Sequence, residues 1–369
     1  MTPKPAAVAE INLGYLIDNV RAIRRKVAPA EVIPVVKADA YGHGALPVVK
    51  ALVREGFDLF AVAQLREALA LRRGGIDRPI LVFGRLLPDE IPRAVSAGLH
   101  LTLFSKQDIQ WITAAGLREP ARVHVNLETG MGRVGVMLAQ EPDFFDVLAQ
   151  APACRLEGIY SHFSTADEAD KAYALTQLMR FRTLLSAAAA KISLPRRIHL
   201  ANSAAVLDMP ETYFNCVRPG IIVYGHYPSA QTSRSLALKP VMAFKTVVAH
   251  VRDMPGGHPI SYGRRFVTDG PTRIAVLPVG YADGLRRDFS NRGRVLIRGR
   301  AYPLVGTITM DQSMVNVGRD VVEHGDEVLL WGESSQGCID VGGIAADIGT
   351  IPYELTCGVS SRVPRVYRR

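Results

Sequence analysis

The chain has 369 residues, of which 48% are hydrophobic, 21% are charged and 7% are aromatic. These proportions are typical of a soluble globular protein and exclude a disordered or fibrous chain. The length predicts two domains, or one large α/β domain with an appendage. The formal net charge of +9 would suit a nucleic-acid partner. The basic residues are scattered, however, so we interpret them as a solvated surface and expect no nucleic-acid binding.

The N-terminal segment and the cysteines exclude further classes of protein. Residues 1–10 hold no apolar run of signal-peptide length, and the chain lacks a stretch of about eighteen apolar residues. We therefore expect a cytoplasmic protein without a membrane span. The four cysteines lie far apart and form no CxxC pair. We expect reduced thiols rather than a metal site or a disulfide framework.

Short strand-like runs alternate with helical stretches in the first part of the chain. The expected strands cover residues 32–37, 57–63, 79–84, 99–104, 121–128, 156–163, 196–202 and 221–225. The longest helical stretch between them runs from residue 167 to about residue 191. This alternation matches a (β/α)8 barrel of the TIM type better than an open sheet. We assign residues 14–235 to this barrel.

After about residue 235 the pattern changes. Strand-like runs are joined by glycine- and proline-rich turns, with one late helix near residues 340–349. We therefore expect residues 236–369 to form a mainly antiparallel β domain. The run at residues 8–13 precedes the barrel and is expected to pair with this β domain instead.

Polar side chains occur where several barrel strands end, which is where (β/α)8 enzymes place their active sites. These residues are Lys37, Arg133, His162, Asn202, Ser203 and Arg218. A lysine at a strand end is often only a surface residue with a buried stem. At a barrel mouth, desolvation lowers the pKa of such an amine and suits it to Schiff-base chemistry. Tyr41 follows closely and offers a hydroxyl near a bound anion, so we favour a functional role for Lys37.

The run RPGIIVYG at residues 218–225 offers the backbone amides of Gly220 and Ile221 beside the last expected strand. Loops after the seventh and eighth strands commonly bind phosphate in this fold. Combined with the lysine, the run predicts a site for pyridoxal 5′-phosphate (PLP). On residue type alone, Tyr262, Tyr281 and Tyr353 are interpreted as partly buried structural tyrosines.

Seven short motifs give the sequence a family resemblance. They are VVKADAYGHG, TGMGRVG, HLANS, RPGIIVYG, SYGRRF, VGYADG and TMDQ. The chain resembles the alanine racemases, in which these motifs occur in the same order across both domains. The resemblance implies a homodimer whose active sites are each completed by the β domain of the partner subunit. It also implies alanine as the substrate and D-alanine supply for peptidoglycan as the role.

The same resemblance assigns roles to individual residues. Lys37 would bind PLP covalently and act as one acid–base group, with Tyr262 of the partner subunit as the second. Two groups on opposite faces are needed because racemisation removes a proton from one side of the α-carbon and returns it to the other. Arg218, with His199 as its partner, would face the pyridine nitrogen and keep it unprotonated, since a guanidinium cannot accept the proton.

The remaining roles follow from matching motifs. The other cofactor contacts implied are Tyr41, His162, Asn202, Ser203, Gly220, Ile221 and Tyr353. The substrate contacts implied are Arg133, Met310, Asp311 and Tyr281. The chain departs from many family members at Asn126, where they have a carbamylated lysine that positions the equivalent of Arg133. Asn126 cannot carry a carbamate, so we hypothesise that an anion such as chloride, or a bridging water, takes its place.

Four alternatives remain open from the sequence. A fold-related PLP amino-acid decarboxylase would place a carboxylate at the pyridine nitrogen, whereas this chain offers Arg218. A racemase of broader specificity would differ in pocket size near Tyr281 and Tyr353, which the sequence does not measure. A non-catalytic PLP carrier of the single-barrel type would lack residues 236–369. A nucleic-acid-binding protein would show steep salt dependence instead of a lysine-bound cofactor.

Overall fold

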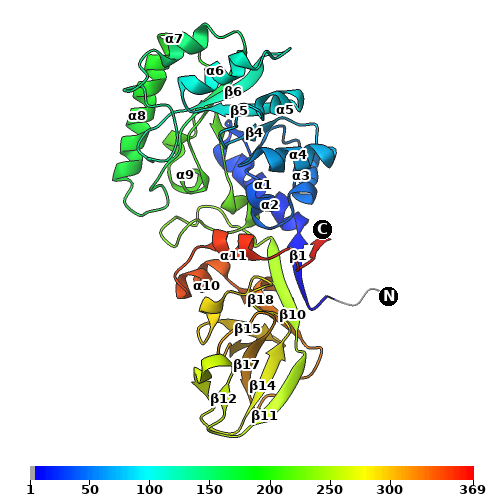
Figure 1. Ribbon diagram of the computed structural model, residues 1–369. Helices are drawn as coiled ribbons and strands as arrows, with labels where there is room; N and C mark the ends of the chain where they lie inside the picture. The colour runs from blue at the N-terminus through cyan, green and yellow to red at the C-terminus, as the bar shows by residue number, and fades with distance from the viewer. Residues whose placement is uncertain (1–4) are drawn as a thin grey trace.

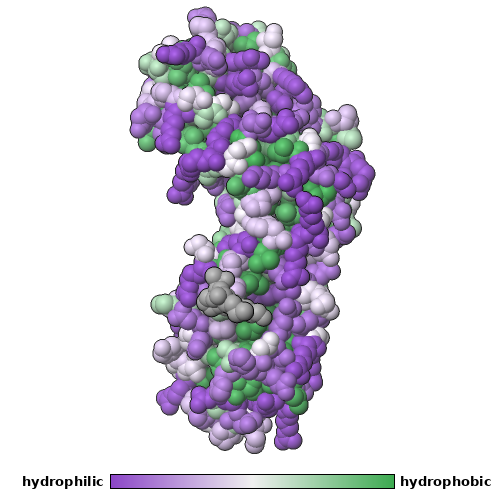
Figure 2. Space-filling model, turned by 90° about the vertical axis from the view of Figure 1, so that its right-hand side faces the viewer, coloured by the Kyte–Doolittle hydropathy of each residue, from purple (hydrophilic) through white to green (hydrophobic). Residues whose placement is uncertain are grey.

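A computed structural model describes residues 5–369 and shows a helix-covered barrel joined to a β domain (Figure 1). The predicted fold class, a TIM-type barrel followed by a mainly β domain, is confirmed. In Figure 2 the barrel overhangs the β domain, so the molecule is hollowed on one side where the two meet. No helix within residues 5–369 is long and apolar enough to cross a membrane. The expectation of no signal sequence rests partly on residues 1–4, which lie outside the described residues.

The barrel sheet has eight parallel strands within the described chain, in the order β2-β9-β8-β7-β6-β5-β4-β3. They are β2 (Glu31–Val32), β3 (Phe60–Val62), β4 (Ile80–Val82), β5 (Leu99–Leu103), β6 (Ala121–Asn126), β7 (Cys154–Tyr160), β8 (Arg197–His199) and β9 (Cys216–Val217). The sheet closes just beyond β2, where Val35 bridges Ala61 and the Val36 N–H donates to the Ala61 carbonyl at 2.8 Å. Closure removes free strand edges and brings the carboxyl ends of all strands to one mouth.

Amphipathic helices cover the outside of the barrel. They are α1 (Leu13–Val27), α3 (Ala45–Arg54), α4 (Leu65–Arg73), α5 (Ile91–Ser96), α6 (Lys106–Ala114), α7 (Phe144–Ala149), α8 (Ala172–Ala189) and α9 (Ser203–Asp208). Local sequence fixes where two of them begin. Gln64 with Glu67 forms a capping box at α4, and Ser105 with Asp108 forms one at α6. Such boxes satisfy backbone N–H groups that a helix start would otherwise leave unpaired.

The described β domain contains a seven-stranded, a three-stranded and a two-stranded sheet, in which the strand pairs are antiparallel except for β1 with β20. Its strands are β1 (Ala7–Asn12), β10 (Met242–Val247), β11 (His250–Met254), β12 (Pro259–Ile260), β13 (Phe266–Val267), β14 (Thr272–Leu277), β15 (Arg294–Ile297), β16 (Arg300–Pro303), β17 (Ser313–Gly318), β18 (Glu327–Ser334), β19 (Gly337–Ile339) and β20 (Arg365–Arg368). The N-terminal strand β1 pairs with β10 and with β20. Helices α10 (Val341–Asp347) and α11 (Pro352–Gly358) lie close to the barrel (Figure 1). The domain limits 14–235 and 236–369 stay predictions.

Two expected barrel strands are wrong in detail. Residues 221–225 were expected as the eighth strand, but Ile221–Tyr224 form a 3-10 helix and β9 is the eighth strand. Gly220, with φ −115° and ψ −91°, turns the chain out of the sheet at this point. The apolar run reflects complete burial, which does not distinguish a strand from a short helix. The expected strand 32–37 also ends early, since Lys37 begins the single turn α2 (Lys37–Tyr41).

Candidate active site

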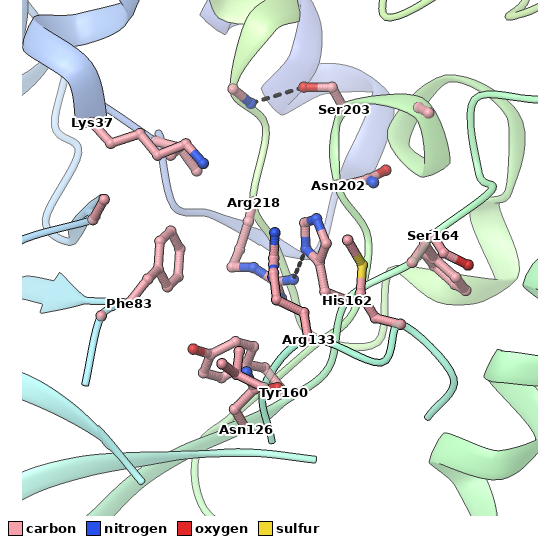
Figure 3. A pocket seen from close by; sticks show the side chains of 18 of the residues that line it. Lys37, Phe83, Asn126, Arg133, Tyr160, His162, Ser164, Asn202, Ser203 and Arg218 are labelled. Carbon is pink, nitrogen blue, oxygen red and sulfur yellow. Dashed lines mark hydrogen bonds between the residues drawn. The ribbon is translucent and has the colours of Figure 1, made fainter. Parts of the chain in front are cut away.

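A cavity of about 510 Å³ opens at the mouth of the barrel. Figure 3 shows Lys37 reaching into it from one side, with Arg218, Arg133 and His162 grouped at its centre. The cavity is lined by most of the predicted site residues: Lys37, Tyr41, Asn126, Arg133, His162, Asn202, Ser203, Arg218, Gly220 and Tyr353. Ile221 is completely buried beside Gly220 and is not part of the lining. The barrel therefore brings together residues that are up to 316 positions apart, Lys37 and Tyr353 being the ends of the set.

The backbone around Lys37 follows an unusual path. Residues 38–41 all have φ between 52° and 55°, which gives one left-handed turn made without glycine. This conformation costs roughly 1–2 kcal/mol per residue, so surrounding contacts must hold it. The turn ends at Gly42, where a Cβ would lie 2.1 Å from the Thr356 carbonyl oxygen. Close packing against α11 therefore requires glycine there.

The Glu67 carboxylate, at the start of α4, fixes the peptide that follows Lys37. It accepts hydrogen bonds from the Ala38 N–H at 2.6 Å, the Ala63 N–H at 2.8 Å and the Gln64 N–H at 2.9 Å. Charge-assisted bonds of this kind are the stronger ones in proteins. They tie the lysine-bearing turn to the neighbouring strand and helix, which keeps the lysine backbone in one place.

The Lys37 amine is half-buried beside another cation. Burial lowers its pKa below the usual 10.5, and the positive charge of Arg133 lowers it further, while Glu67 acts in the opposite direction. Both lowering effects penalise the ammonium form. The neutral amine, which is the form able to attack a carbonyl carbon, therefore becomes available nearer to neutral pH.

Tyr41, Gly220 and Ser203 form a compact group at one edge of the cavity. The Gly220 N–H donates to the Ser203 hydroxyl oxygen at 2.8 Å. A Cβ at position 220 would lie 2.2 Å from the Tyr41 hydroxyl oxygen, so only glycine allows this approach. Burial raises the pKa of Tyr41 and keeps its phenol protonated. The group offers hydroxyl donors to an anion, and Asn202 supports it by accepting a bond from the Ala205 N–H at the start of α9.

The Arg218 guanidinium is buried at the centre of the site, with 4% of its surface exposed. Nη1 donates to the His199 carbonyl oxygen at 2.6 Å and to His199 Nδ1 at 2.9 Å. Nη2 donates to the Ser161 carbonyl oxygen at 2.6 Å, with His162 Nδ1 3.4 Å away. Burial lowers the pKa of Arg218 to about 10, so the group stays charged. Within residues 5–369, Arg218 pairs with no carboxylate, and its Nε–H has no hydrogen-bond acceptor.

The structure adds residues that sequence reasoning missed. The Tyr160 ring stacks on the His199 ring at 4.9 Å and 10°, and the Arg218 guanidinium carbon lies 4.9 Å from the Tyr160 centroid. Phe83, at the end of β4, also lines the cavity. A signal was available for Tyr160, because it stands two residues before His162 on the same strand run. Residues two apart on a strand share one face.

Arg133 and Asn126 lie near each other in the cavity lining but differ in exposure. Asn126 is 5% exposed at the end of β6, while Arg133 is exposed on the loop that follows. The hydrogen bonds and ion pairs within residues 5–369 leave the Arg133 guanidinium without an acceptor. It is therefore available to an anion that enters the cavity.

Apart from Tyr353 of α11, the predicted site residues within residues 236–369 are not brought into this cavity. Tyr262 is 74% exposed, Met310 52% and Tyr281 42%, and none of them lines it. Asp311 is also absent from the lining and pairs with Arg362 at 2.9 Å. Backbone bonds hold these segments together: the Tyr281 N–H donates to the Thr309 carbonyl oxygen at 3.0 Å. A single chain thus carries two separate groups of predicted residues.

The comparisons with known proteins agree in both halves of the chain. Residues 11–228 match the alanine racemase N-terminal domain and residues 241–367 the alanine racemase C-terminal domain. The alanine racemase of Clostridium novyi (strain NT) is 43% identical over 367 residues, covering 97% of this chain and 94% of that protein. The solved alanine racemase of Clostridium difficile 630 superposes with a TM-score of 0.93 at 37% identity, covering 99% of this chain and 96% of that one.

A third relative extends this agreement to a liganded structure. The alanine racemase of Bacillus anthracis with bound L-Ala-P superposes with a TM-score of 0.93 at 36% identity, covering 100% of this chain and 96% of that one. Sequence identity and the superposition both extend over the barrel and the β domain. The barrel-mouth cavity, the two-domain fold and these matches lead to one conclusion: the chain belongs to the alanine racemase family.

Proposed function

We propose that this chain is a PLP-dependent racemase that interconverts L-alanine and D-alanine and supplies D-alanine for peptidoglycan. The observation that carries the proposal is that two key residues line the same cavity. In it a half-buried lysine with a lowered pKa faces a buried arginine that has no carboxylate partner within residues 5–369. Family membership supports the substrate assignment.

The residues present fit PLP. Its phosphate would be held by the hydroxyl groups of Tyr41 and Ser203 and by the backbone at Gly220, where a side chain would collide with Tyr41. Asn202, Ile221 and Tyr353 would complete that end, and His162 would lie against the ring. The free Nε–H of Arg218 suits a ring nitrogen. When bound, PLP supplies an electron sink for the negative charge left when the α-carbon loses its proton.

Lys37 and Tyr262 of the partner subunit would move the proton. Lys37 would hold the cofactor and then exchange a proton at one face of the α-carbon. The cavity also contains the phenols of Tyr41, Tyr160 and Tyr353, but burial raises the pKa of all three, that of Tyr160 to about 12. Tyr262 is exposed on the β domain, and its match to the family motif makes it the candidate for the opposite face.

The surroundings of Arg218 favour racemisation over decarboxylation. A carboxylate at the ring nitrogen would stabilise its protonated form, whereas a guanidinium donates a hydrogen bond and leaves the nitrogen unprotonated. The negative charge at the α-carbon would then spread less into the ring. Return of the proton to the same carbon would therefore be favoured over side reactions such as transamination.

Arg133 would bind the alanine carboxylate, with Met310, Asp311 and Tyr281 of the partner subunit closing the site. We propose that chloride or a water bound at Asn126 orients Arg133. Crystals grown in bromide would show an anomalous peak beside Asn126 if an anion takes this place. The absence of a peak and of bound water there would contradict this proposal.

The proposed site requires a homodimer, since Tyr262, Tyr281, Met310 and Asp311 do not line the barrel cavity of their own chain. This pairing would place the exposed Tyr262, Tyr281 and Met310 of one subunit at the barrel mouth of the other. The cost of exposing these large side chains in a single chain would then be recovered as buried apolar contact.

Incubation of the purified protein with L-alanine and PLP, followed by chiral analysis, tests the function. We expect an equal mixture of L- and D-alanine. Serine and lysine, added singly, test the alternative of a broader racemase, which would convert them at comparable rates. Formation of carbon dioxide and an amine without D-alanine would establish a decarboxylase and contradict the proposal.

A further inference from the structure

Three histidine rings form a row behind Arg218, inside the barrel and away from the cavity. His199 Nε2 lies 3.0 Å from His124 Nδ1, and His124 Nε2 lies 3.1 Å from His100 Nδ1. The three residues come from β8, β6 and β5, and each has at most 2% of its surface exposed. Neither His100 nor His124 lines the cavity. The row starts at the Arg218 guanidinium, 2.9 Å from His199 Nδ1.

Hydrogen-bond chemistry gives this row one direction. A guanidinium can only donate, so His199 Nδ1 must accept and the proton of its neutral ring sits on Nε2. His199 then donates to His124 Nδ1, which places the His124 proton on Nε2, and the same logic applies to His100. Burial lowers the pKa of all three rings, that of His100 to about 3, so they are neutral near pH 7. The row ends at His100 Nε2, which has no partner within residues 5–369.

A glycine on the intervening strand makes the row possible. Gly158 of β7 pairs with His124 of β6 on one side and with Arg197 of β8 on the other. A Cβ at position 158 would lie 2.3 Å from His124 Nδ1, the atom that accepts from His199. Its backbone is not in the left-handed region that favours glycine. Space for the His124 ring is therefore the reason for glycine at this position.

The row also compensates the charge of Arg218. Burying a cation without a carboxylate is costly unless fixed dipoles and hydrogen bonds replace water. Every ring in the row points its nitrogen lone pair toward Arg218 and its N–H away from it, which is the favourable orientation next to a cation. Hydrogen bonds in such a chain polarise one another. Reversing one ring would set two N–H groups against each other.

We propose that His100 and His124 are positioning residues for Arg218: with His199 and the gap at Gly158 they form a one-directional hydrogen-bond chain, its direction set by the donating guanidinium, that holds the His199 ring and through it the orientation of the guanidinium. The proposal rests on the proposed function for its catalytic consequence only. The tautomers themselves belong to the protein whether or not it racemises alanine. Loss of the chain would loosen the group that faces the cofactor ring.

The test compares His100→Phe, which removes the acceptor for His124, with His100→Asn, whose side-chain oxygen can replace Nδ1 as acceptor. Each holoenzyme is labelled with ¹⁵N in the histidine rings, and nitrogen NMR reads which ring nitrogen carries the proton. We expect Nε2–H rings at His199 and His124 in the wild type and in His100→Asn. In His100→Phe the His124 Nε2–H loses its acceptor, so we expect its signal to shift and the His199 Nε2–H signal to broaden as both rings become mobile. The wild-type chiral assay on the same preparation tests the proposed function separately.

Gly158→Ala is the second variant, because it keeps all three rings and presses chiefly on His124, with one further close contact of 3.1 Å to the Arg197 carbonyl oxygen. We expect the same broadened His199 signal, kcat lowered about tenfold with little change in KM, and more transamination per turnover. Tenfold is roughly the upper limit for one lost hydrogen bond between neutral groups. Adding His100→Phe to Gly158→Ala should change kcat little further, since the chain is already broken. Unchanged His124 and His199 ring signals in both variants, or identical behaviour of His100→Asn and His100→Phe, would overturn the proposal.

Discussion

The barrel and the β domain carry their predicted functional residues in opposite ways. In the barrel, Lys37, His162 and Arg218 converge on a concave cavity. In the β domain, Tyr262 and Met310 stand exposed and line no part of that cavity. The first arrangement can hold a small molecule, whereas the second offers side chains that another surface could cover. The difference is what the proposed homodimer would explain.

The two regions also differ in their histidines. The buried ones are all in the barrel: His43, His100, His124, His199 and His226. The histidines of the β domain, His250, His258 and His324, are all exposed. The barrel interior therefore holds neutral imidazoles that acid would charge, while the interior of the described β domain holds no histidine. Catalytic polarity and acid sensitivity should both reside in the barrel.

Mixing two inactive variants tests most strongly whether one active site uses residues of two chains. Lys37→Ala should lose the yellow colour of the bound cofactor and reduce kcat about 10⁴-fold, and Tyr262→Phe should reduce it at least about 10²-fold. In a heterodimer, one site would combine the intact Lys37 of one chain with the intact Tyr262 of the other. We expect activity to return to about half of the wild-type level per heterodimer, because one of its two sites is intact.

Hydrogen exchange at the α-carbon gives this experiment its control. In D₂O, Tyr262→Phe should still exchange the α-proton of one enantiomer through Lys37 and should lose exchange of the other. A variant that had merely misfolded would lose both. No recovery of activity in verified heterodimers, or normal exchange of both enantiomers by Tyr262→Phe, would show that the site is not shared between subunits.

Arg133→Gln tests the electrostatics of the barrel cavity. Uptake of PLP by the apoprotein requires the neutral Lys37 amine, so its rate should rise with pH through a pKa below the usual 10.5. Arg133 contributes to lowering that pKa. Removing its charge favours the ammonium form, so the midpoint of the rate profile should move to higher pH. Stopped-flow absorbance measures it, and an unchanged or lower midpoint would contradict the expected direction.

Acid unfolding tests whether acid sensitivity resides in the barrel. Burial lowers the pKa of His43 and His100 to about 3 and that of His226 to about 4, against 6.5 for an ordinary histidine. The unfolded chain therefore binds more protons, and stability is lost as pH falls from 6.5 towards 3. Each such ring contributes a slope of about 1.4 kcal/mol per pH unit within that window.

The two tryptophans report separately on acid unfolding of the barrel and of the β domain, because Trp111 lies in the barrel helix α6 and Trp331 in the β-domain core. Single-tryptophan variants, Trp331→Phe and Trp111→Phe, report each region by fluorescence. We expect the Trp111 signal to change at a higher pH than the Trp331 signal. A Trp331 transition that comes first would refute the assignment of acid sensitivity to the barrel.

Some of this molecule follows from local sequence. Strand–helix alternation indicated the barrel, glycine-rich turns indicated the β domain, and strand-end polar residues indicated the mouth. Local pattern failed at residues 221–225, where complete burial of a short helix resembles a strand. It also missed Tyr160, whose role depends on contacts with His199 and Arg218 rather than on its neighbours in the chain.

The sequence itself thus determined the order of the motifs and allowed Lys37 and Arg218 to be picked out as site residues, because periodicity and residue type are local properties. Only the tertiary structure decided that His100, His124 and His199 meet in one row, since strand register and the gap at Gly158 set distances across a barrel. It likewise decided that Tyr262 points away from its own cavity. Which surface a side chain faces depends on the packing of whole elements, and that is not written in any one segment.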